Sequence, residues 1–228
     1  GYRAKTRFAK FYNLPELMSM FKEVADIQTA ETLKLPVPKA NFKTIAVKPS
    51  EIQREMVADL GKRADAIRKK EVDSKTDNML KITNEGRKLA LDQRLLNDML
   101  GDFEGSKVNI CANNVYEIWE RTAEKKSTQL VFCDLSTPNN EGKFNVYDDL
   151  KEKLINKGIP ENEISFIHEA NTETRKKELF AKVRKGDVRV LIGSTAKMGA
   201  GTNVQNKIIA LHHLDCPWRP ADLTQRNR

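Results

Sequence analysis

The sequence predicts an α/β fold in which a parallel β-sheet carries helices on both faces and follows a mainly helical segment. Two observations lead to this prediction. After Gly105, short apolar runs of strand length alternate with stretches whose apolar residues recur at helical spacing. Before Gly105 the helical spacing dominates. Buried strands that alternate with helices favour a parallel sheet covered on both sides.

The segment before Gly105 is predicted to hold three helices and one short strand. Apolar residues recur at helical spacing over residues 11–24. Residues 42–47 are predicted to form a short strand. A helix is expected to begin after Ser50, whose side chain is suited to cap it, and to cover residues 51–70. A further helix is predicted over residues 78–100.

The chain is predicted to divide into two domains, residues 1–104 and 105–228. Glycine and acidic residues cluster at 101–105 without periodicity, which is typical of a boundary. In the second domain we expect helices at about 108–118, 145–156 and 172–185, and strands at 129–133, 164–167, 188–192 and 208–211.

Polar residues follow four of the predicted strands. They are Asp134, the pair His168-Glu169, the segment 193–203, and the segment 215–220. The carboxyl ends of parallel strands meet at one edge of the sheet, which is where such sheets place their working surface. The sequence therefore predicts a functional edge built from these four segments.

The segment 193–203 is the richest of the four. Its glycines allow tight turns and close approach to a ligand, and exposed backbone N–H groups in such a loop hold phosphate oxygens. A glycine-rich turn that only connects a strand to a helix is the alternative, and glycines alone favour it. The sequence contains no G-x-x-x-x-G-K-[ST] phosphate-binding loop.

Several segments, in this order, resemble the motifs of superfamily-two DNA helicases and translocases of the Swi/Snf type. Residues 190–205 resemble motif V, and residues 214–220 resemble the D-x-x-W-x-P segment that precedes motif VI. Gln225-Arg226 resembles the start of motif VI, and residues 129–133 resemble motif IV. The linked set is specific, whereas no single piece would be.

The N-terminal half extends the resemblance. Residues 45–53 resemble the strand and S-x-x-Q that leave the first motor lobe. Residues 8–26 and 132–138 resemble the helicase region of phage and mobile-element proteins that fuse this motor to an adenine DNA methyltransferase. No methyltransferase motif occurs in these residues.

The resemblance implies a C-terminal RecA-like lobe joined to an inter-lobe helical segment. In this family ATP and Mg²⁺ bind between two lobes, and DNA is the substrate. The implied partners are DNA and an N-terminal motor lobe in the same polypeptide. Gln225-Arg226-Asn227 fits the start of the family's motif VI, and Arg228 stands where that pattern has glycine or any residue. The two arginine fingers of the motif are expected to follow residue 228, so we expect the chain to stop within motif VI. Without a phosphate-binding loop and arginine fingers, the chain alone is expected to be inactive and to hold no cofactor.

The resemblance also assigns roles to individual residues. The incomplete motif VI would supply the catalytic residues Gln225, Arg226 and Arg228. Nucleotide would be bound by Gly199, Gly201, Asn203 and Gln225. DNA would be bound by Ser194, Thr195, Lys197, Arg175 and His168. Two alternatives stay open at this point: Arg175 as a solvated helical arginine, and Trp218 either stacked on a base or packed against the lobe.

Other classes of protein fit less well. A degenerate module that binds nucleic acid or protein without motor activity is the main alternative. A small-molecule α/β enzyme would need a nucleophile or an acid–base pair at the strand ends. His168-Glu169 is the only such pair in the sequence, and adjacent residues of a strand point to opposite faces. No metal site is predicted, because His212, His213 and Cys216 lack a fourth ligand and a standard zinc spacing.

Charge and cysteine content agree with this interpretation. The formal net charge of +8 permits contact with a phosphate backbone without proving it. The three cysteines are far apart in apolar stretches, which predicts buried free thiols in a reducing compartment. No apolar segment has the length of a membrane span. We expect a cytoplasmic protein of bacterial, phage or mobile-element origin.

Overall fold

The computed structural model describes residues 12–28, 40–138, 142–198 and 204–227. Contacts divide the chain into two compact units, residues 1–45 and residues 46–228. The helical residues 51–95 therefore fall within the same compact unit as the sheet. The division into two domains at residue 104 stays a prediction.

The first unit contributes one described helix, α1 (Leu14–Val24). Asn13 precedes it in the left-handed region, with φ of 52°, and a proline lies in its first turn. None of its residues is buried, and Phe21 is 53% exposed. The strand predicted over residues 42–47 is wrong, because these residues form no β-pairing. Phe42 is 83% exposed, so the alternating apolar residues lack the buried face that a strand needs.

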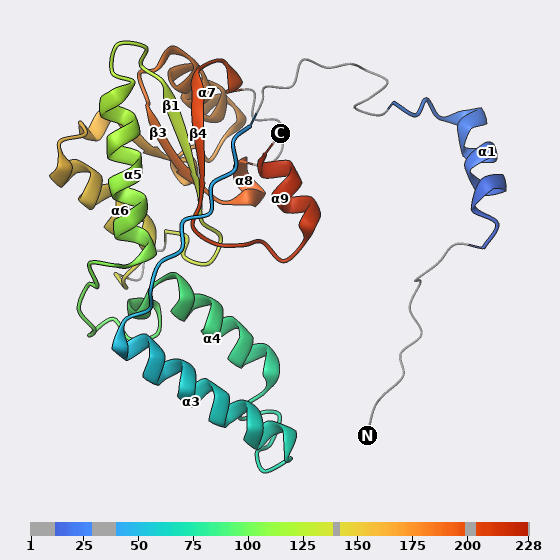
Figure 1. Ribbon diagram of the computed structural model, residues 1–228. Helices are drawn as coiled ribbons and strands as arrows, with labels where there is room; N and C mark the ends of the chain where they lie inside the picture. The colour runs from blue at the N-terminus through green and yellow to red at the C-terminus, as the bar shows by residue number, and fades with distance from the viewer. Residues whose placement is uncertain (1–11, 29–39, 139–141, 199–203, 228) are drawn as a thin grey trace. The chain divides into compact units, whose positions relative to one another are not determined.

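A hairpin of two helices, α3 (Glu51–Arg68) and α4 (Met79–Leu91), opens the second unit (Figure 1). The predicted N-cap is confirmed: the Ser50 hydroxyl accepts from the Gln53 N–H, and the Gln53 side chain accepts from the Ser50 N–H. This reciprocal pair satisfies two N–H groups that the helix leaves free. Between the helices, Arg63 bridges Asp77 at 2.7 Å and Glu85 at 2.5 Å.

The helix predicted over 78–100 ends early, at Leu91. Asp92 takes an extended conformation and its carboxylate accepts from the backbone N–H of Arg94 at 2.9 Å. This bond starts a 3-10 turn, η1 (Gln93–Leu95), that redirects the chain toward the sheet. An aspartate that caps a new turn competes with helix continuation, which explains the shorter helix.

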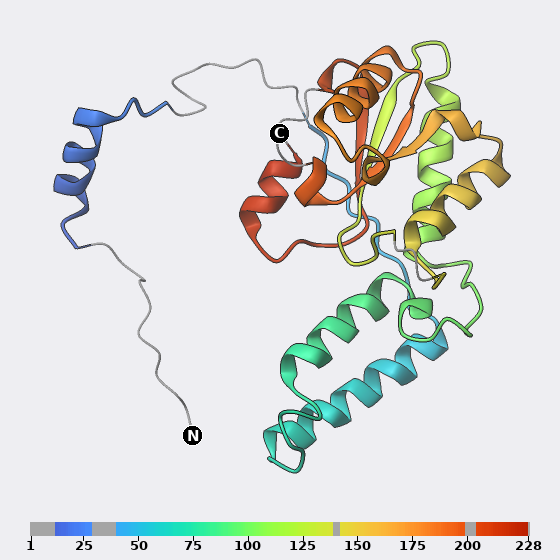
Figure 2. The ribbon, with the colours of Figure 1, turned by 180° about the vertical axis from the view of Figure 1, so that it is seen from behind.

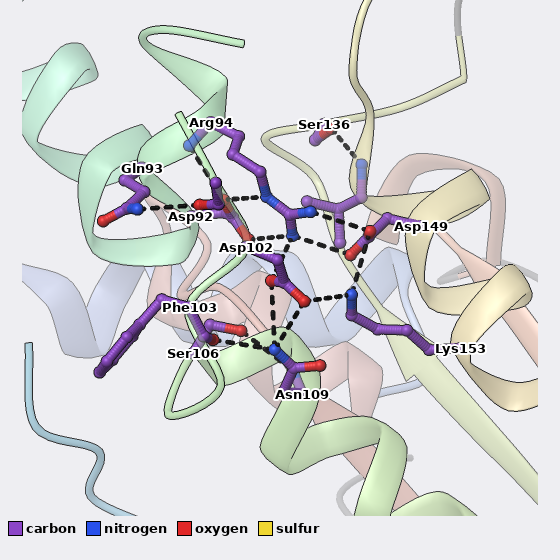
Figure 3. Close-up of polar contacts among 12 residues, drawn as sticks. Asp92, Gln93, Arg94, Asp102, Phe103, Ser106, Asn109, Ser136, Asp149 and Lys153 are labelled. Atoms are coloured by element: carbon purple, nitrogen blue, oxygen red, sulfur yellow. Dashed lines mark hydrogen bonds and ion pairs between the residues drawn. The ribbon is translucent and has the colours of Figure 1, made fainter. Parts of the chain in front are cut away.

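The base of the hairpin is fixed to the rest of the unit by charged side chains (Figure 3). We call Asp92, Arg94, Asp102, Asp149 and Lys153 the junction cluster. Arg94 pairs with Asp92 at 2.8 Å, with Asp149 at 2.9 Å and with Asp102 at 3.1 Å. Lys153 pairs with Asp102 at 2.8 Å and with Asp149 at 3.1 Å. Burial disfavours the charged form of Arg94, but the carboxylates outweigh it and raise its pKa above the ordinary value.

A parallel sheet of four strands follows, in the order β2-β3-β1-β4. Its strands are β1 (Thr128–Phe132), β2 (Ile164–Phe166), β3 (Val190–Gly193) and β4 (Ile208–His213). The helices are α5 (Lys107–Arg121), α6 (Val146–Lys157), α7 (Glu173–Lys185), α8 (Thr195–Met198) and α9 (Pro220–Arg226). Short 3-10 turns are η2 (Glu161–Glu163), η3 (Ile167–Glu169) and η4 (Gln205–Lys207).

Helices cover both faces of this sheet, as predicted (Figure 1, Figure 2). Alternate residues of β1 enter two cores: Val131 packs with α5 and α6, and Leu130 packs with α7. The period of two in a strand produces this division. The α/β fold class is thereby confirmed, and the arrangement is compatible with a RecA-like lobe.

The cysteines follow the expectation in part. Cys111 and Cys133 are buried free thiols, and burial raises the pKa of Cys111 to about 12. Cys216 is exposed, because the loop after β4 leaves the sheet, so its predicted burial is wrong. Within the described residues, no helix has both the length and the apolar character needed to cross a bilayer.

Candidate functional site

Three of the predicted strand-end segments meet at one edge of the sheet. The parallel register brings the ends of β1, β3 and β4 together, since Phe132 lies opposite Gly193 on one side and His213 on the other. The helices α8 and α9 lie at this edge (Figure 1). Three side chains from these segments, Asp134, Thr195 and Asp215, interlock with Arg226 of α9, and we call these four residues the strand-end cluster.

Arg226 is the centre of the strand-end cluster. Its side chain is completely buried, although arginine is seldom found inside a protein without a partner. Nε donates to Thr195 Oγ1 at 2.7 Å, and Nη2 donates to Asp134 Oδ2 at 2.8 Å and to Asp215 Oδ1 at 3.1 Å. Nη1 donates to the Asp215 carbonyl at 2.8 Å and lies 3.4 Å from His213 Nδ1. The five N–H groups of the guanidinium thus all have a neighbour within the lobe.

The two carboxylates of the cluster are fixed by backbone as well as by arginine. Asp134 Oδ1 accepts from the Thr195 N–H and Oδ2 from the Thr195 hydroxyl, both at 2.7 Å. Asp215 Oδ2 accepts from the backbone N–H groups of Asp134 at 2.6 Å and Leu135 at 2.8 Å. Burial opposes the ionisation of Asp134, but the bonds from Thr195 and the charge of Arg226 outweigh it and keep its pKa below the ordinary value.

Gly193 is required at the end of β3 by packing. A Cβ atom at this position would lie 2.6 Å from Ile167 Cγ2 and 2.6 Å from Met198 Sδ. Because Gly193 has none, η3 and α8 pack directly against the end of the strand. Gly193, the first glycine of the predicted loop, therefore allows close packing between a strand and a helix. This role agrees with the alternative in which the glycine-rich turn only connects the two elements.

His168 and Lys197 lie next to each other beside the strand-end cluster. His168 belongs to η3, so the predicted strand ends one residue early, at Phe166. Its ring stacks edge-on against Tyr147, and Nδ1 is buried without a hydrogen-bond partner among the described residues. Burial and then the charge of Lys197 lower the pKa of His168. Lys197 is partly exposed, so it supplies positive charge to the surface beside His168.

The remaining predicted residues occupy different environments. Ser194 is buried, and its carbonyl accepts from the N–H of Lys197 at 3.1 Å. Arg175 is exposed in the first turn of α7, where Thr172 caps its backbone N–H at 3.2 Å. Gln225 is exposed on α9. Gly199, Gly201, Asn203 and Arg228 lie outside the described residues.

Trp218 does not pack into the sheet domain. The indole is 64% exposed, and the Arg87 guanidinium from α4 lies 4.3 Å from its ring centroid. Arg87 also donates to the Cys216 carbonyl at 2.6 Å, which ties the loop after β4 to the hairpin. An exposed indole beside a guanidinium is a surface on which a base can stack.

His212 and His213 both make contacts within the protein. His212 Nε2 lies 2.9 Å from Gln129 Oε1, and burial lowers the His212 pKa to about 4. The His213 ring stacks on Phe132, and its Nε2 lies 3.0 Å from the Asn227 side-chain oxygen. The two rings thus help to hold β4 and α9.

Sequence reasoning placed Asp134 and Asp215 at strand ends but gave neither a role. A signal was present, because each is an acidic residue separated by a single residue from the end of a strand. Their partner Arg226 follows 92 and 11 positions later, and no local pattern shows that separation. No family model matches the chain, and no curated protein matches it significantly.

The described residues near this edge include two cations and an exposed aromatic ring. Lys197 and Arg175 supply positive charge, and Trp218 supplies a flat apolar surface. Groups of this kind bind phosphates and bases. In the strand-end cluster one guanidinium binds two carboxylates, so these side chains are engaged with one another and their contribution is to hold α8 and α9 in place.

Proposed function

We propose that the chain is the second motor lobe of a superfamily-two, Swi/Snf-like ATP-dependent DNA helicase or translocase. The support is the ordered set of motif-like segments together with an α/β fold of the compatible type. In this proposal the lobe closes on ATP and contacts the DNA backbone. The first motor lobe of the same polypeptide supplies the phosphate-binding loop and the Mg²⁺ carboxylate.

One observation carries the proposal. Thr195 and Arg226 lie in the segments that resemble motif V and motif VI and are 31 positions apart in the sequence, yet their side chains are hydrogen-bonded at 2.7 Å. The D-x-x-W-x-P-like segment joins them, because Asp215 binds the same guanidinium at 3.1 Å. Three segments that were grouped by resemblance alone thus share one cluster at the carboxyl edge of a parallel sheet, where such sheets bind ligands.

The exposed groups at this edge have defined roles in the proposal. Lys197 and Arg175 bind DNA phosphates, His168 adds a weak polar contact, and Gln225 faces the nucleotide. Arg226 is held inside the lobe by five contacts with four residues. We therefore assign it to the support of motif VI and not to a phosphate of ATP.

Binding to duplex DNA tests the first half of the proposal. A labelled 30-base-pair duplex is titrated with the chain at several salt concentrations, and affinity is followed by fluorescence anisotropy. Weak binding is expected, with log K falling linearly against log salt. Lys197→Ala is expected to lower the affinity and to reduce the salt slope by about 1.

Lys125→Ala is the matched control, because this exposed lysine lies before β1, at the opposite edge of the sheet. It is expected to leave both affinity and slope unchanged. Equal losses for Lys125→Ala and Lys197→Ala would show that binding is diffuse electrostatic attraction. Such a result would contradict a DNA track at the carboxyl edge.

ATP hydrolysis tests the second half. The chain alone is expected to hydrolyse no ATP, since its sequence contains no phosphate-binding loop of the Walker type. Joined to the first motor lobe, it is expected to restore DNA-stimulated hydrolysis. Robust magnesium-dependent ATPase activity of the chain alone would contradict the assignment of roles to the two lobes.

A second candidate is a module that binds nucleic acid without motor activity. It is favoured by the saturation of the strand-end cluster, in which Arg226 and the two carboxylates satisfy one another. Such a module would bind DNA in the same titration but would not support hydrolysis when joined to the first lobe. The joined protein therefore separates the two candidates.

A further inference from the structure

The strand-end cluster links the residue that faces nucleotide in the proposed function to the residue that faces DNA. Gln225 and Arg226 are neighbours on α9, and Thr195 and Lys197 lie on α8. Thr195 Oγ1 accepts from Arg226 Nε at 2.7 Å and donates to Asp134 at 2.7 Å. One hydroxyl thus stands between the two helices.

We propose that Arg226 is a positioning residue that sets the orientation of α8, and hence of Lys197, according to the position of α9. This inference rests on the proposed function and adds a route between its two ligands. A shift of α9 on closing over nucleotide would move the guanidinium, which binds both the Thr195 hydroxyl and the Asp134 carboxylate. Thr195 would follow, because Asp134 also holds its N–H.

The length of α8 explains why the cluster can control it. The helix has only four residues, which is too short to be stable through its own hydrogen bonds. Its start is held by Thr195 on Asp134, and its last residue, Met198, packs against the bare backbone of Gly193. Lys197 lies between Thr195 and Met198, so its orientation depends on these tertiary contacts. Arg226 supplies the buried positive charge among them.

A purely structural arginine makes a different prediction, and the chain offers a matched control. Arg189 is also buried, and it donates to the carbonyls of Ser127 at 3.1 Å and Trp119 at 2.6 Å. It precedes β3, at the opposite edge of the sheet from α8. Arg189→Lys disturbs a buried arginine network of similar kind without touching the proposed route.

A double-mutant cycle on DNA binding by the 228-residue chain tests the inference. Lys197→Ala is measured in the wild-type, Arg226→Lys and Arg189→Lys backgrounds with the 30-base-pair duplex. We expect Lys197→Ala to weaken binding about tenfold in the wild type and with Arg189→Lys, but less than threefold with Arg226→Lys. Equal losses in all three backgrounds would overturn the inference.

Amide hydrogen exchange gives a second measurement that needs no ligand. Arg226→Lys is expected to speed exchange in residues 195–198 at least fivefold more than Arg189→Lys does. Thr195→Val should reproduce this effect, and Thr195→Ser, which keeps the hydroxyl, should restore slow exchange. Unchanged exchange in residues 195–198 for Arg226→Lys and Thr195→Val would overturn the inference.

DNA binding and amide hydrogen exchange distinguish a failure of the proposed function from a failure of the positioning role. A wild-type chain that binds no DNA refutes the proposed function, while the exchange experiment still decides whether Arg226 positions α8. A wild-type chain that binds DNA, with additive losses and unchanged exchange, refutes the positioning role and leaves the proposed function standing. If Arg226→Lys fails to fold, the Thr195→Val and Thr195→Ser pair carries both measurements.

Discussion

Replacement of Arg94 by methionine is expected to destabilise the chain strongly, because Arg94 is the main cation of the junction cluster (Figure 3). Its side chain is 10% exposed and binds Asp92 through Nε at 2.9 Å and Nη2 at 2.8 Å. It binds Asp149 through Nη1 at 3.0 Å and Nη2 at 2.9 Å. Methionine fills similar space but leaves these carboxylates without the guanidinium.

The cost follows from what each carboxylate keeps. Asp149 and Asp102 retain Lys153 at 3.1 Å and 2.8 Å. Asp92, whose side chain is 2% exposed, retains the backbone N–H of residue 94 as its one side-chain partner among the described residues. Breaking a buried ion pair from one side costs about 3–5 kcal/mol. Because two of the three carboxylates keep a cation, we expect the lower end, about 3 kcal/mol.

Urea denaturation followed by tryptophan fluorescence measures this cost through the shift of the midpoint. Arg68→Met is the control, since Arg68 and Asp65 are 75% and 64% exposed and 3.5 Å apart. An exposed pair of this kind is worth less than about 0.5 kcal/mol. A loss for Arg94→Met no larger than that of the control would refute the role of the junction cluster.

A second variant separates the buried charge from the lost packing. Adding Asp92→Asn to Arg94→Met removes the charge that was left unpaired but keeps an oxygen that accepts from the residue 94 N–H. The double variant is expected to be more stable than Arg94→Met by about 1 kcal/mol or more. A double variant less stable than Arg94→Met would show that solvation of Asp92 is not the main cost.

The remaining predictions concern the sheet. Gly193→Ala places a Cβ 2.6 Å from Met198 Sδ and is expected to cost about 1–3 kcal/mol in urea, whereas Gly61→Ala, with open space around it, should not destabilise. Burial lowers the His212 pKa from 6.5 to about 4, so the unfolded chain binds the proton more readily. Stability is therefore expected to fall between pH 6.5 and 4, by at most about 3 kcal/mol from this residue. His212→Asn should flatten that part of the pH profile, and an unchanged profile would contradict the assignment.

The sequence predicted most of the fold because the elements of the second half carry local signals. The run at residues 129–133 is of strand length and is buried on both faces, which is typical of a strand in a covered sheet. Ser50 and Gln53 gave a helix start that depends on neighbours three residues apart. The errors fell where tertiary contacts override local pattern: Asp92 ended a helix early, and residues 42–47 had no buried face to form a strand.

The candidate site was predictable only as a place. Parallel strands bring their carboxyl ends together, so the edge followed from the order of elements. The partners of Arg226 did not follow, because they lie 31 and 92 positions away and their contact depends on the register of three strands. The same limit applies to Arg87 and Trp218, which meet through the hairpin. Motif patterns identify residue types, whereas burial decides which of them face a ligand.

The two arginines that are buried among the described residues show why that distinction matters. Arg189 and Arg226 lie at opposite edges, and each binds groups that follow or precede strands. Arg189 binds neutral carbonyls and a distant Glu163 at 3.9 Å, so it holds loops that carry no predicted function. Arg226 binds two carboxylates and the hydroxyl that starts α8. If Arg226 positions α8 as we propose, its replacement changes the orientation of the cation that this four-residue helix carries, whereas replacement of Arg189 does not.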